Sequence, residues 1–366
     1  MLLEGIRIID FTRLLPGPYA TLRLADMGAS IIKIEDPPHG DPARYMGLQI
    51  GGTGAVFLAN NRNKTSIVLD LKDAQDLERA WALIQAADVV IEGFRPGVAD
   101  RLGIGYAKAS VLNPEVIYCS LEGYDRQDPM SAMGGHDLNF MALSGVLSLM
   151  PDAQGHPAMP HIQWADLLGG IAACEAILAA LVARGQTGRG QHVEVAMADV
   201  LSGLLTTHVL VEQATHSDQG LEELNGSRVC YHLYTTKDGR DVALAALERK
   251  FWANFCTAVD RPQWLAGQFA PAVAKNPVYE AMVSLFASRS WSAWRDFSQT
   301  VDCCLTPVMT VGEASTRFQQ NAHSGVWDMD SPEAGTVRQA WTFAGGAKPD
   351  AGRIHTAPPP LRPKTE

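Results

Sequence analysis

Segments with strand-like and helix-like periodicity of hydrophobic and polar residues alternate along the first part of the chain. Residues 5–10 (GIRIID) form a short β-branched run that predicts a strand, and residues 19–29 (YATLRLADMGA) follow with helical spacing. Residues 29–36 (ASIIKIED) predict a second strand. A strand, a turn, a helix and a strand in this order form the repeating unit of a parallel sheet.

The same pattern recurs downstream. Residues 65–71, 88–94 and 116–124 predict further strands, and residues 73–87 predict an amphipathic helix among them. We therefore predict an α/β fold, with a doubly wound parallel sheet in a large domain that spans residues 1–212.

The turn after the first strand lacks the glycine-rich fingerprint of dinucleotide-binding domains. Pro16-Gly17-Pro18 occupies this turn, and no GxGxxG stands at a strand–helix turn of the domain. Proline has no backbone N–H to donate, so the turn is a poor cradle for a pyrophosphate.

The second half of the chain predicts a change of architecture. Residues 166–184 form a helix that is apolar almost all round, which indicates deep burial. Residues 213–228 are predicted to be a linker. A hairpin at residues 230–247, followed by tryptophan-rich helices, predicts a smaller α+β domain over residues 229–324. The Pro- and Gly-rich tail, residues 325–366, is predicted to return to the large domain.

Composition excludes several classes of protein. The hydrophobic fraction of 46% and the charged fraction of 19% are those of a folded globular chain. A net charge of −10 argues against broad nucleic-acid binding, while local basic residues decide whether an anionic ligand binds. No apolar run approaches a membrane span and no secretory signal opens the chain, so we predict a cytoplasmic protein with no membrane partner.

Neither the cysteines nor the histidines indicate a metal site. The six cysteines form no CxxC pair, and most stand among apolar neighbours, as reduced buried cysteines do. The histidines form no HxxxH or HExxH pattern. We therefore expect no metal and no tightly bound cofactor.

Asp166 stands at the start of the apolar helix, in the segment QWADLLGG. An aspartate there is a good N-cap, and position alone favours that structural role. The functional alternative is a carboxylate at the floor of a pocket. In that case Gly169 and Gly170 keep the first helical turn small, so that a ligand can approach closely.

His136 precedes another predicted helix, residues 137–149, and follows Gly134 and Gly135. A histidine in this position can simply cap or pack. The functional alternative is that the glycines leave backbone amides free near a positive helix end, with Asp137 supplying one of them. Such amides would stabilise a carbonyl oxygen as it gains negative charge.

Glu248 ends a predicted strand and begins the segment ERKFW. As a surface glutamate it would merely start a helix, and this role is favoured by position. As a functional residue it would hydrogen-bond a catalytic imidazole and fix its tautomer.

Several basic residues border predicted strand ends of the large domain. Such residues are usually solvated, yet ligands bind at the carboxyl edge of these sheets, and a few of the cations could hold phosphates. The residues concerned are Arg62, Lys64, Lys72, Arg95 and Arg101.

Collinear segments over nearly the whole chain resemble the class III (family III) CoA-transferase superfamily, which includes α-methylacyl-CoA racemases. The resemblance is carried by GIRIIDFTRLLPGPYATLRLADMGASIIKIE, IEGFRPGVADRLGIGY, GGHDLNFMALSGVL, the Asp166 helix with TGRGQHVEVAMADV, and CYHLYTTKDGRDVALAALERKFW. It implies an acyl-CoA thioester as the substrate, with coenzyme A present as part of that substrate.

The resemblance also implies roles for three residues. In the transferases, an aspartate matching Asp166 is the nucleophile. In the racemases, that aspartate and a histidine matching His136 act as acid and base on opposite faces of the α-carbon, and a glutamate matching Glu248 supports the histidine. Because all three are present, we expect a racemase or epimerase of a 2-methylacyl-CoA or similar thioester.

Two alternatives stay open. The first is a CoA-transferase that moves CoA between carboxylic acids through an Asp166 intermediate. The second is a CoA-binding protein without chemistry, against which the three intact residues argue. The identity of the acyl group is not readable from the sequence.

The resemblance further implies the contacts with CoA and the assembly. Leu15 stands where formyl-CoA transferases have a functional glutamine, and Asp36 stands where members often have an arginine. Two chains are expected to form an interlocked homodimer, with each site between the large domain of one chain and the small domain of the other. The expected CoA contacts are Leu15, Leu69, Leu71, Lys72, Gly93, Phe94, Arg95, Arg101, Gly134, Gly135 and Asp137.

Overall fold

Contacts between residues divide the chain into two compact units, with the boundary between Leu205 and Thr206. The computed structural model describes residues 2–152 and 154–319. The predicted tail, residues 325–366, lies outside the described residues.

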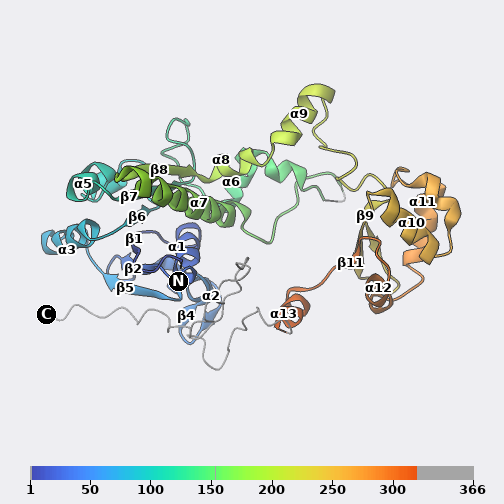
Figure 1. The fold of residues 1–366 in the computed structure, drawn as a ribbon, viewed down its shortest axis with the longest axis horizontal. Coiled ribbons are helices and arrows are strands. Elements are labelled where there is room, and N and C mark those ends of the chain that lie inside the picture. The colour runs from blue at the N-terminus through green and yellow to red at the C-terminus, as the bar shows by residue number, and fades with distance from the viewer. Residues whose placement is uncertain (1, 153, 320–366) are drawn as a thin grey trace. The chain divides into compact units, whose positions relative to one another are not determined.

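A parallel sheet forms the centre of the first unit (Figure 1). In the part of the chain described, it has six strands in the order β5-β2-β1-β6-β7-β8, and every neighbouring pair is parallel. The predicted doubly wound parallel sheet is therefore confirmed. The strands are β1 (Arg7–Asp10), β2 (Ser30–Glu35), β5 (Lys64–Val68), β6 (Val89–Glu92), β7 (Ile117–Glu122) and β8 (Gln191–Ala196).

Alternate residues of the strands point to opposite faces of the sheet, because the side-chain period of a strand is two. Ile8 and Ile91 pack in one core with residues of α1 and α7, whereas Ile9 and Val90 pack in another with residues of α3 and α5. Both faces are thus covered, which explains why the strands are apolar throughout. These helices are α1 (Pro16–Asp26), α3 (Ala74–Gln85), α5 (Tyr106–Leu112) and α7 (Trp164–Thr187).

Shorter elements complete the first unit. They are η1 (Pro42–Arg44), β3 (Gln49–Ile50), β4 (Thr53–Gly54), α2 (Ala55–Asn61), α4 (Val98–Arg101), α6 (Asp137–Ser144), η2 (Val146–Leu149) and α8 (Met197–Gly203). The predicted helix 137–149 is therefore interrupted. Gly145 has a left-handed φ of 88° and ends α6 before the 3₁₀ turn begins.

Helix α7 corrects the expectation that no segment approaches a membrane span. It is long and apolar enough by length and composition, with a mean hydropathy of 1.9 over an 18-residue window. Its buried residues, among them Ala173 and Ile177, belong to the core that it shares with α1 and the sheet. Core helices of water-soluble folds pass the same test, so this finding is weak evidence for a membrane span.

The second unit has its own sheet and core. β9 (Tyr231–Thr235) and β10 (Asp241–Ala245) form the predicted hairpin, and β11 (Leu305–Pro307) pairs with β10. Fully buried aromatic residues, including Trp252, Phe286 and Trp294, fill the core. The remaining elements are α9 (Thr206–Thr215), α10 (Arg249–Ala258), η3 (Pro262–Gly267), α11 (Pro277–Phe286), α12 (Trp291–Ser298) and α13 (Val311–Gln319).

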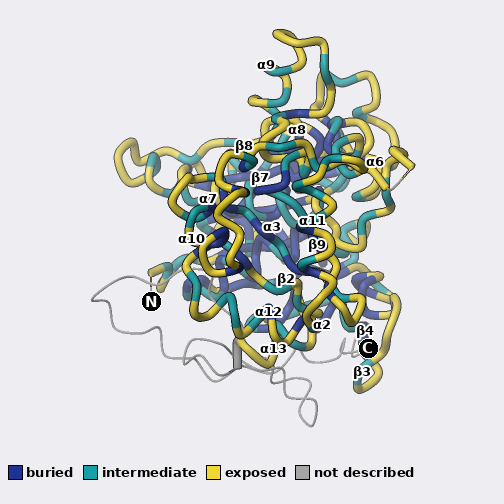
Figure 2. The backbone as a smooth tube through the Cα atoms, turned by 90° about the vertical axis from the view of Figure 1, so that its right-hand side faces the viewer, coloured by how far each residue is buried: buried dark blue, intermediate teal, exposed yellow. Residues whose placement is uncertain are grey.

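Helix α9 lies in the region where the sequence suggested the end of the large domain and a linker. It has no buried residue, in contrast to the buried strands of the first unit (Figure 2). Residues 216–230 then carry no helix or strand. A chain segment without a buried face suits a connection between two separately packed units.

Candidate active site

The strand order of the first unit creates a topological switch point between β1 and β6. In open α/β sheets of this kind, ligands bind in the crevice outside the carboxyl ends of the strands at that point. Leu15 follows β1, and Gly93, Phe94 and Arg95 follow β6. Four of the predicted CoA contacts therefore stand beside the crevice that the topology provides.

Arg13 is a residue of this crevice that the sequence analysis missed. Its guanidinium carbon lies 5.6 Å from the centre of the Phe94 ring, so it bridges the loops after β1 and β6. One guanidinium nitrogen lies 4.0 Å from Asp36 Oδ1, so the charge of Asp36 has a cation beside it. The rule that selected Arg95, a cation following a strand end, would have found Arg13 too.

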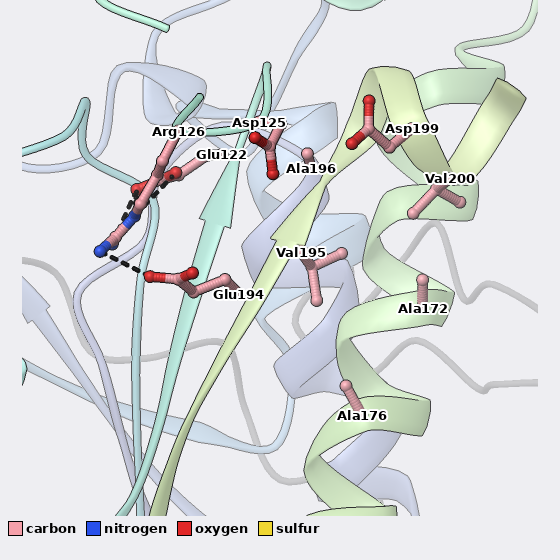
Figure 3. Close-up of a pocket in the computed structure, with 10 residues that line it drawn as sticks. All are labelled: Glu122, Asp125, Arg126, Ala172, Ala176, Glu194, Val195, Ala196, Asp199 and Val200. Carbon is pink, nitrogen blue, oxygen red and sulfur yellow. Dashed lines mark hydrogen bonds and ion pairs between the residues drawn. The ribbon is translucent and has the colours of Figure 1, made fainter. Parts of the chain in front are cut away.

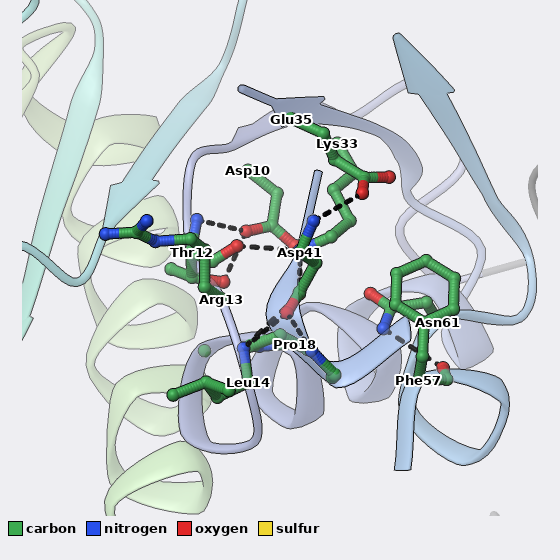
Figure 4. A network of polar contacts seen from close by, with 12 residues as sticks. Asp10, Thr12, Arg13, Leu14, Pro18, Lys33, Glu35, Asp41, Phe57 and Asn61 are labelled. Atoms are coloured by element: carbon green, nitrogen blue, oxygen red, sulfur yellow. Dashed lines mark hydrogen bonds and ion pairs between the residues drawn. The ribbon is translucent and has the colours of Figure 1, made fainter. Parts of the chain in front are cut away.

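A buried polar network supports the loop after β1 (Figure 4). Asp41 Oδ1 accepts a hydrogen bond from the Leu14 backbone N–H at 3.0 Å, and Asp41 Oδ2 lies 2.9 Å from Lys33 Nζ. Leu14 has a φ of 66°, a left-handed conformation that is costly for a non-glycine residue. The buried ion pair therefore holds a strained turn directly before Leu15.

Two of the basic residues considered for phosphate binding are excluded by their positions. Lys64 is 4% exposed and bonds to Asp10, and Arg62 is 7% exposed and bonds to Asp26. Arg62 precedes β5 and Lys64 is its first residue, so neither follows the end of a strand, and the Lys64 ammonium is buried against Asp10 at the end of β1. The prediction that each basic residue borders the ligand-binding edge is therefore wrong for these two.

The other predicted contacts differ in accessibility. Lys72, Arg95 and Arg101 are exposed and can reach a solvated phosphate. Leu69 is 1% exposed and packs in the core, so only its backbone could meet a ligand. Leu71 is half-buried against the same core.

The glycines before His136 differ in how tightly they are enclosed: Gly135 lies against buried rings, whereas Gly134 lies against the end of a flexible arginine side chain. A Cβ on Gly135 would lie 2.6 Å from the Phe140 ring, and one on Gly134 would lie 2.8 Å from a guanidinium nitrogen of Arg95. Arg95, from the end of β6, therefore lies against the loop that leads into His136. The structure brings these predicted residues together, although they are far apart in sequence.

His136 is exposed at the N-cap of α6. Its backbone N–H donates to Asn139 Oδ1 at 3.0 Å, which fixes the approach of the chain to the helix. Within the described part of the chain, the backbone N–H groups of Asp137 and Leu138 have no hydrogen-bond acceptor. These amides are free to bind an anionic oxygen, as the sequence analysis expected for Asp137.

Asp166 is not the N-cap of α7, and the structural role favoured by its position in the sequence is wrong. The helix begins at Trp164 with Gln163 as its N-cap, so Asp166 lies within the first turn. The acceptor for this helix start is Asp137, whose Oδ1 receives the N–H of Ala165 at 2.7 Å and that of Asp166 at 3.1 Å. The starts of α6 and α7 are thereby joined.

The Asp166 carboxyl is partly buried. Burial raises its pKa to about 7, and the nearby negative charge of Asp137 adds to this rise. Perturbed carboxyl groups beside a ligand crevice are candidates for proton transfer or nucleophilic attack.

Gly169 and Gly170 do not open the first turn to a ligand. A Cβ on Gly170 would lie 2.6 Å from the carbonyl oxygen of Pro16 in α1, and one on Gly169 would lie 2.5 Å from the Met197 side chain. Both glycines are buried. Their role is to let neighbouring helices pack closely against α7, which corrects the functional interpretation from the sequence.

Glu248 belongs to the second unit. It is exposed at the N-cap of α10, and its side chain makes no capping hydrogen bond. Its partnership with His136 stays a prediction.

A cavity lies away from these residues, beside β7, β8, α7 and α8 (Figure 3). It has a volume of about 410 Å³, and its walls carry four carboxylates from Glu122, Asp125, Glu194 and Asp199 with one cation from Arg126. This excess of negative charge would repel phosphates, so the cavity is not a CoA site. In residues 2–152 and 154–319, no group of side chains is placed to hold a metal ion.

Comparisons with known proteins agree with this arrangement. The model of CoA-transferase family III matches residues 3–363. Succinyl-CoA:glutarate CoA-transferase of Mus musculus is 36% identical over 344 residues, covering 92% of this chain and 78% of that protein. Alpha-methylacyl-CoA racemase of the same species is 30% identical over 349 residues, covering 93% and 86%.

A solved structure has a similar fold. The crystal structure of Rv3272 from M. tuberculosis superposes with a TM-score of 0.80 at 28% identity, covering 97% of this chain and 96% of that one.

Proposed function

We propose, because the chain belongs to CoA-transferase family III, that it is an enzyme that moves the α-proton of a branched acyl-CoA thioester and so interconverts the two epimers. One observation carries this proposal. Asp137 bonds to the start of α7, so the helix that begins beside His136 and the helix that bears Asp166 adjoin at their N-termini. Two proton-transferring groups then flank one site that lies beside free backbone amides.

The chemistry follows from the thioester. Its carbonyl makes the α-hydrogen weakly acidic, and removal of that hydrogen leaves an enolate. The free N–H groups of Asp137 and Leu138 would hold the enolate oxygen. One of His136 and Asp166 removes the proton, and the conjugate acid of the other returns a proton to the opposite face of the α-carbon. Each such group is typically worth about 10²–10⁴-fold in rate.

The CoA portion is proposed to lie in the crevice between the ends of β1 and β6. Arg13, Arg95 and Arg101 bring positive charge to loops around this crevice, and Lys72 follows β5 at the same edge of the sheet. The free helix start at α6 would then bind the thioester oxygen near His136. In this arrangement the phosphates stay at the solvated rim while the acyl group enters toward Asp166.

We also propose a homodimer in which Glu248 of one chain supports His136 of the other. The resemblance to the family implies this arrangement. The first unit contributes one supporting observation, since an apolar groove runs along α1 and α7, lined by Met27, Ile171, Leu178 and Val182 among others. Val182 is 65% exposed in the single chain, and apolar surface of this kind often marks an interface.

A CoA-transferase is the second candidate. Succinyl-CoA:glutarate CoA-transferase of Mus musculus is 36% identical to this chain over 344 residues. In that reaction Asp166 would attack the thioester carbonyl and release CoA as a thiolate, which then attacks the Asp166 carbonyl and frees the donor acid. The acceptor carboxylate would attack the resulting Asp166 thioester and release the thiolate again. Attack of the thiolate on the acceptor's carbonyl would give the new acyl-CoA and free Asp166. A carboxylate with a raised pKa is a more basic nucleophile, so the environment of Asp166 suits this chemistry too.

Incubation of a single 2-methylacyl-CoA epimer in deuterium oxide separates the two candidates. The racemase should place deuterium at the α-carbon without any acceptor acid, as read by mass spectrometry. In His136→Ala the rate of deuterium incorporation should fall at least about 100-fold, because one face of the α-carbon lacks its acid or base. His156→Ala, which removes an exposed histidine from a loop outside the site, serves as the matched control.

A transferase would give a different result in the same experiment. If no α-branched thioester gains deuterium, but labelled CoA passes between two carboxylic acids and the His136→Ala protein retains that transfer, the racemase proposal is wrong and the transferase takes its place.

A further inference from the structure

The start of α7 takes its hydrogen-bond acceptor from another helix. Gln163 stands at the N-cap but makes no capping bond with its side chain. The first N–H groups of any α-helix lack partners within the helix and need acceptors from elsewhere. Here a single oxygen, Asp137 Oδ1, accepts from both Ala165 and Asp166.

Asp137 therefore contributes through both its backbone and its side chain. It is the first residue of α6, so its backbone N–H lies at the free helix start beside His136. Its side chain extends to α7 and bonds to the backbone of Asp166 itself. The sequence indicates only the backbone amide, because nothing in the spacing of residues 137 and 166 shows that the two helix starts adjoin.

We propose that the Asp137 carboxylate is a positioning residue for Asp166, fixing the first turn of α7 against α6 and setting by its negative charge the electrostatic environment in which the Asp166 carboxyl works. The inference rests on the proposed function only in taking Asp166 as the reacting group. It holds for proton transfer and for nucleophilic attack alike.

The hydrogen bonds and the charge have separate effects. Two N–H donors at 2.7 and 3.1 Å fix the backbone of α7, so the direction of the Asp166 side chain depends on Asp137. The charge acts on ionisation, since two neighbouring carboxylates disfavour each other's charged forms. An acceptor without charge at residue 137 would therefore keep the first effect and remove the second.

Other titratable groups on elements that pack against α7 do not account for the behaviour of Asp166. These elements carry Arg23 on α1, Glu122 on β7, Glu194 on β8, Asp199 on α8 and His136 beside α6. Burial is the larger cause of the raised pKa of Asp166, and Asp137 is the one charged group among the described residues that adds to it.

Asp137→Asn and Asp137→Ala separate the two effects. Asparagine retains an acceptor oxygen and caps helices well, so α7 should stay in place while the charge is lost. The limb of the kcat–pH profile that reports Asp166 should then move to lower pH by roughly 0.5–1 unit, because removal of a like charge favours the ionised form. Alanine loses the acceptor as well, so its kcat should fall at least about tenfold further at every pH.

Asp73→Asn is the matched control, since Asp73 also caps a helix in the first unit by accepting two backbone N–H groups, from Gln75 and Asp76. It should leave the midpoint of the kcat–pH profile where it is in the unaltered protein. An unmoved midpoint in Asp137→Asn, or an equal shift in Asp73→Asn, overturns the proposal.

A second readout needs no activity. Asp166→Asn is made alone and in an Asp137→Asn background, and the pH dependence of unfolding is measured for all four proteins. Asp166→Asn should gain stability over the protein with Asp166 above a certain pH, where the buried carboxyl ionises. That pH should be lower when residue 137 is asparagine than when it is aspartate. If no turnover of any kind is found but this shift is present, the proposed function fails while the role of Asp137 stands. If turnover is found without the shift, the inference fails.

Discussion

At the scale of single residues, Asp166 shows two opposing influences on one carboxyl group. Its place in the first turn of α7 exposes it to the positive end of the helix dipole, which favours the ionised form by about 0.3–1 kcal/mol. Burial disfavours that form, and one pKa unit corresponds to about 1.4 kcal/mol. A pKa raised to about 7 shows that burial outweighs the dipole, so the group is poised between its two forms near neutral pH.

Asp166→Asn should therefore abolish turnover and yet stabilise the fold above neutral pH. The folded pKa is raised from 3.8 to about 7, so the stability conferred by the protonated form is full below pH 3.8 and is lost as pH rises through 7. Asparagine carries no charge to bury. Its thermal midpoint should exceed that of the unaltered protein by about 2–8 °C at pH 8, and the gain should shrink toward pH 4. Thermal unfolding followed by circular dichroism across this range checks both signs.

At the scale of elements, α7 organises the site because it contacts α1, α6, α8 and the sheet. Three glycines in this helix meet different surroundings. Gly170 faces the backbone of α1 at Pro16, Gly169 faces the flexible side chain of Met197, and a Cβ on Gly185 would meet nothing within 4 Å. Close approach of α1 to α7 at Gly170 also fixes the turn before α1, which carries Leu15.

The change in stability caused by alanine at each of these glycines should depend on what the new methyl group contacts. Gly170→Ala should destabilise by about 1–3 kcal/mol, because the backbone of α1 has to move. Gly169→Ala should cost less, since Met197 can adopt another rotamer. Gly185→Ala, the control in the same helix, should stabilise by about 0.5–1 kcal/mol through its better helix propensity. Urea unfolding of the three variants tests this order, and a stability loss at Gly185 equal to that at Gly170 would contradict it.

At the scale of the whole molecule, the chain contains two units with separate cores. His136 and Asp166 belong to the first unit, and Glu248 belongs to the second. If Glu248 acts on the His136 of another chain, each active site of a homodimer takes its residues from two chains.

Co-expression of Asp166→Asn and Glu248→Ala chains with different tags tests this arrangement. In a hybrid dimer with shared sites, one site would carry both substitutions and the other neither, so the hybrid should retain about half of the unaltered activity. If each chain supplied its own Glu248, both sites would be damaged and the hybrid would be as inactive as the parents. Light scattering of the purified hybrid confirms that it is a dimer before activity is measured.

The sequence by itself determined most strands of the first sheet and the longer helices α1, α3 and α7, but not short helices such as α2, α4 and α5. Strand and helix periods differ, so apolar runs at residues 5–10, 29–36 and 88–94 identified sheet strands, and the regular alternation with helices implied parallel pairing. Arg95 was expected at the ligand-binding edge because carboxyl ends of parallel strands meet there, whereas Leu15, Gly93 and Phe94 were expected from the family resemblance. The collinear segments identified the family.

Contacts between distant residues were decided only by the tertiary structure. The pattern around Asp166 suggested an N-cap, but the acceptor comes from Asp137 on another helix. Likewise, Gly170 was expected to let a ligand approach, but it lets α1 approach α7. Lys64 was considered as a phosphate ligand, but it is buried against Asp10. Periodicity reports which face of an element avoids water, whereas a hydrogen bond or a close approach depends on what another element places opposite that face. That second kind of information exists only once the chain has folded.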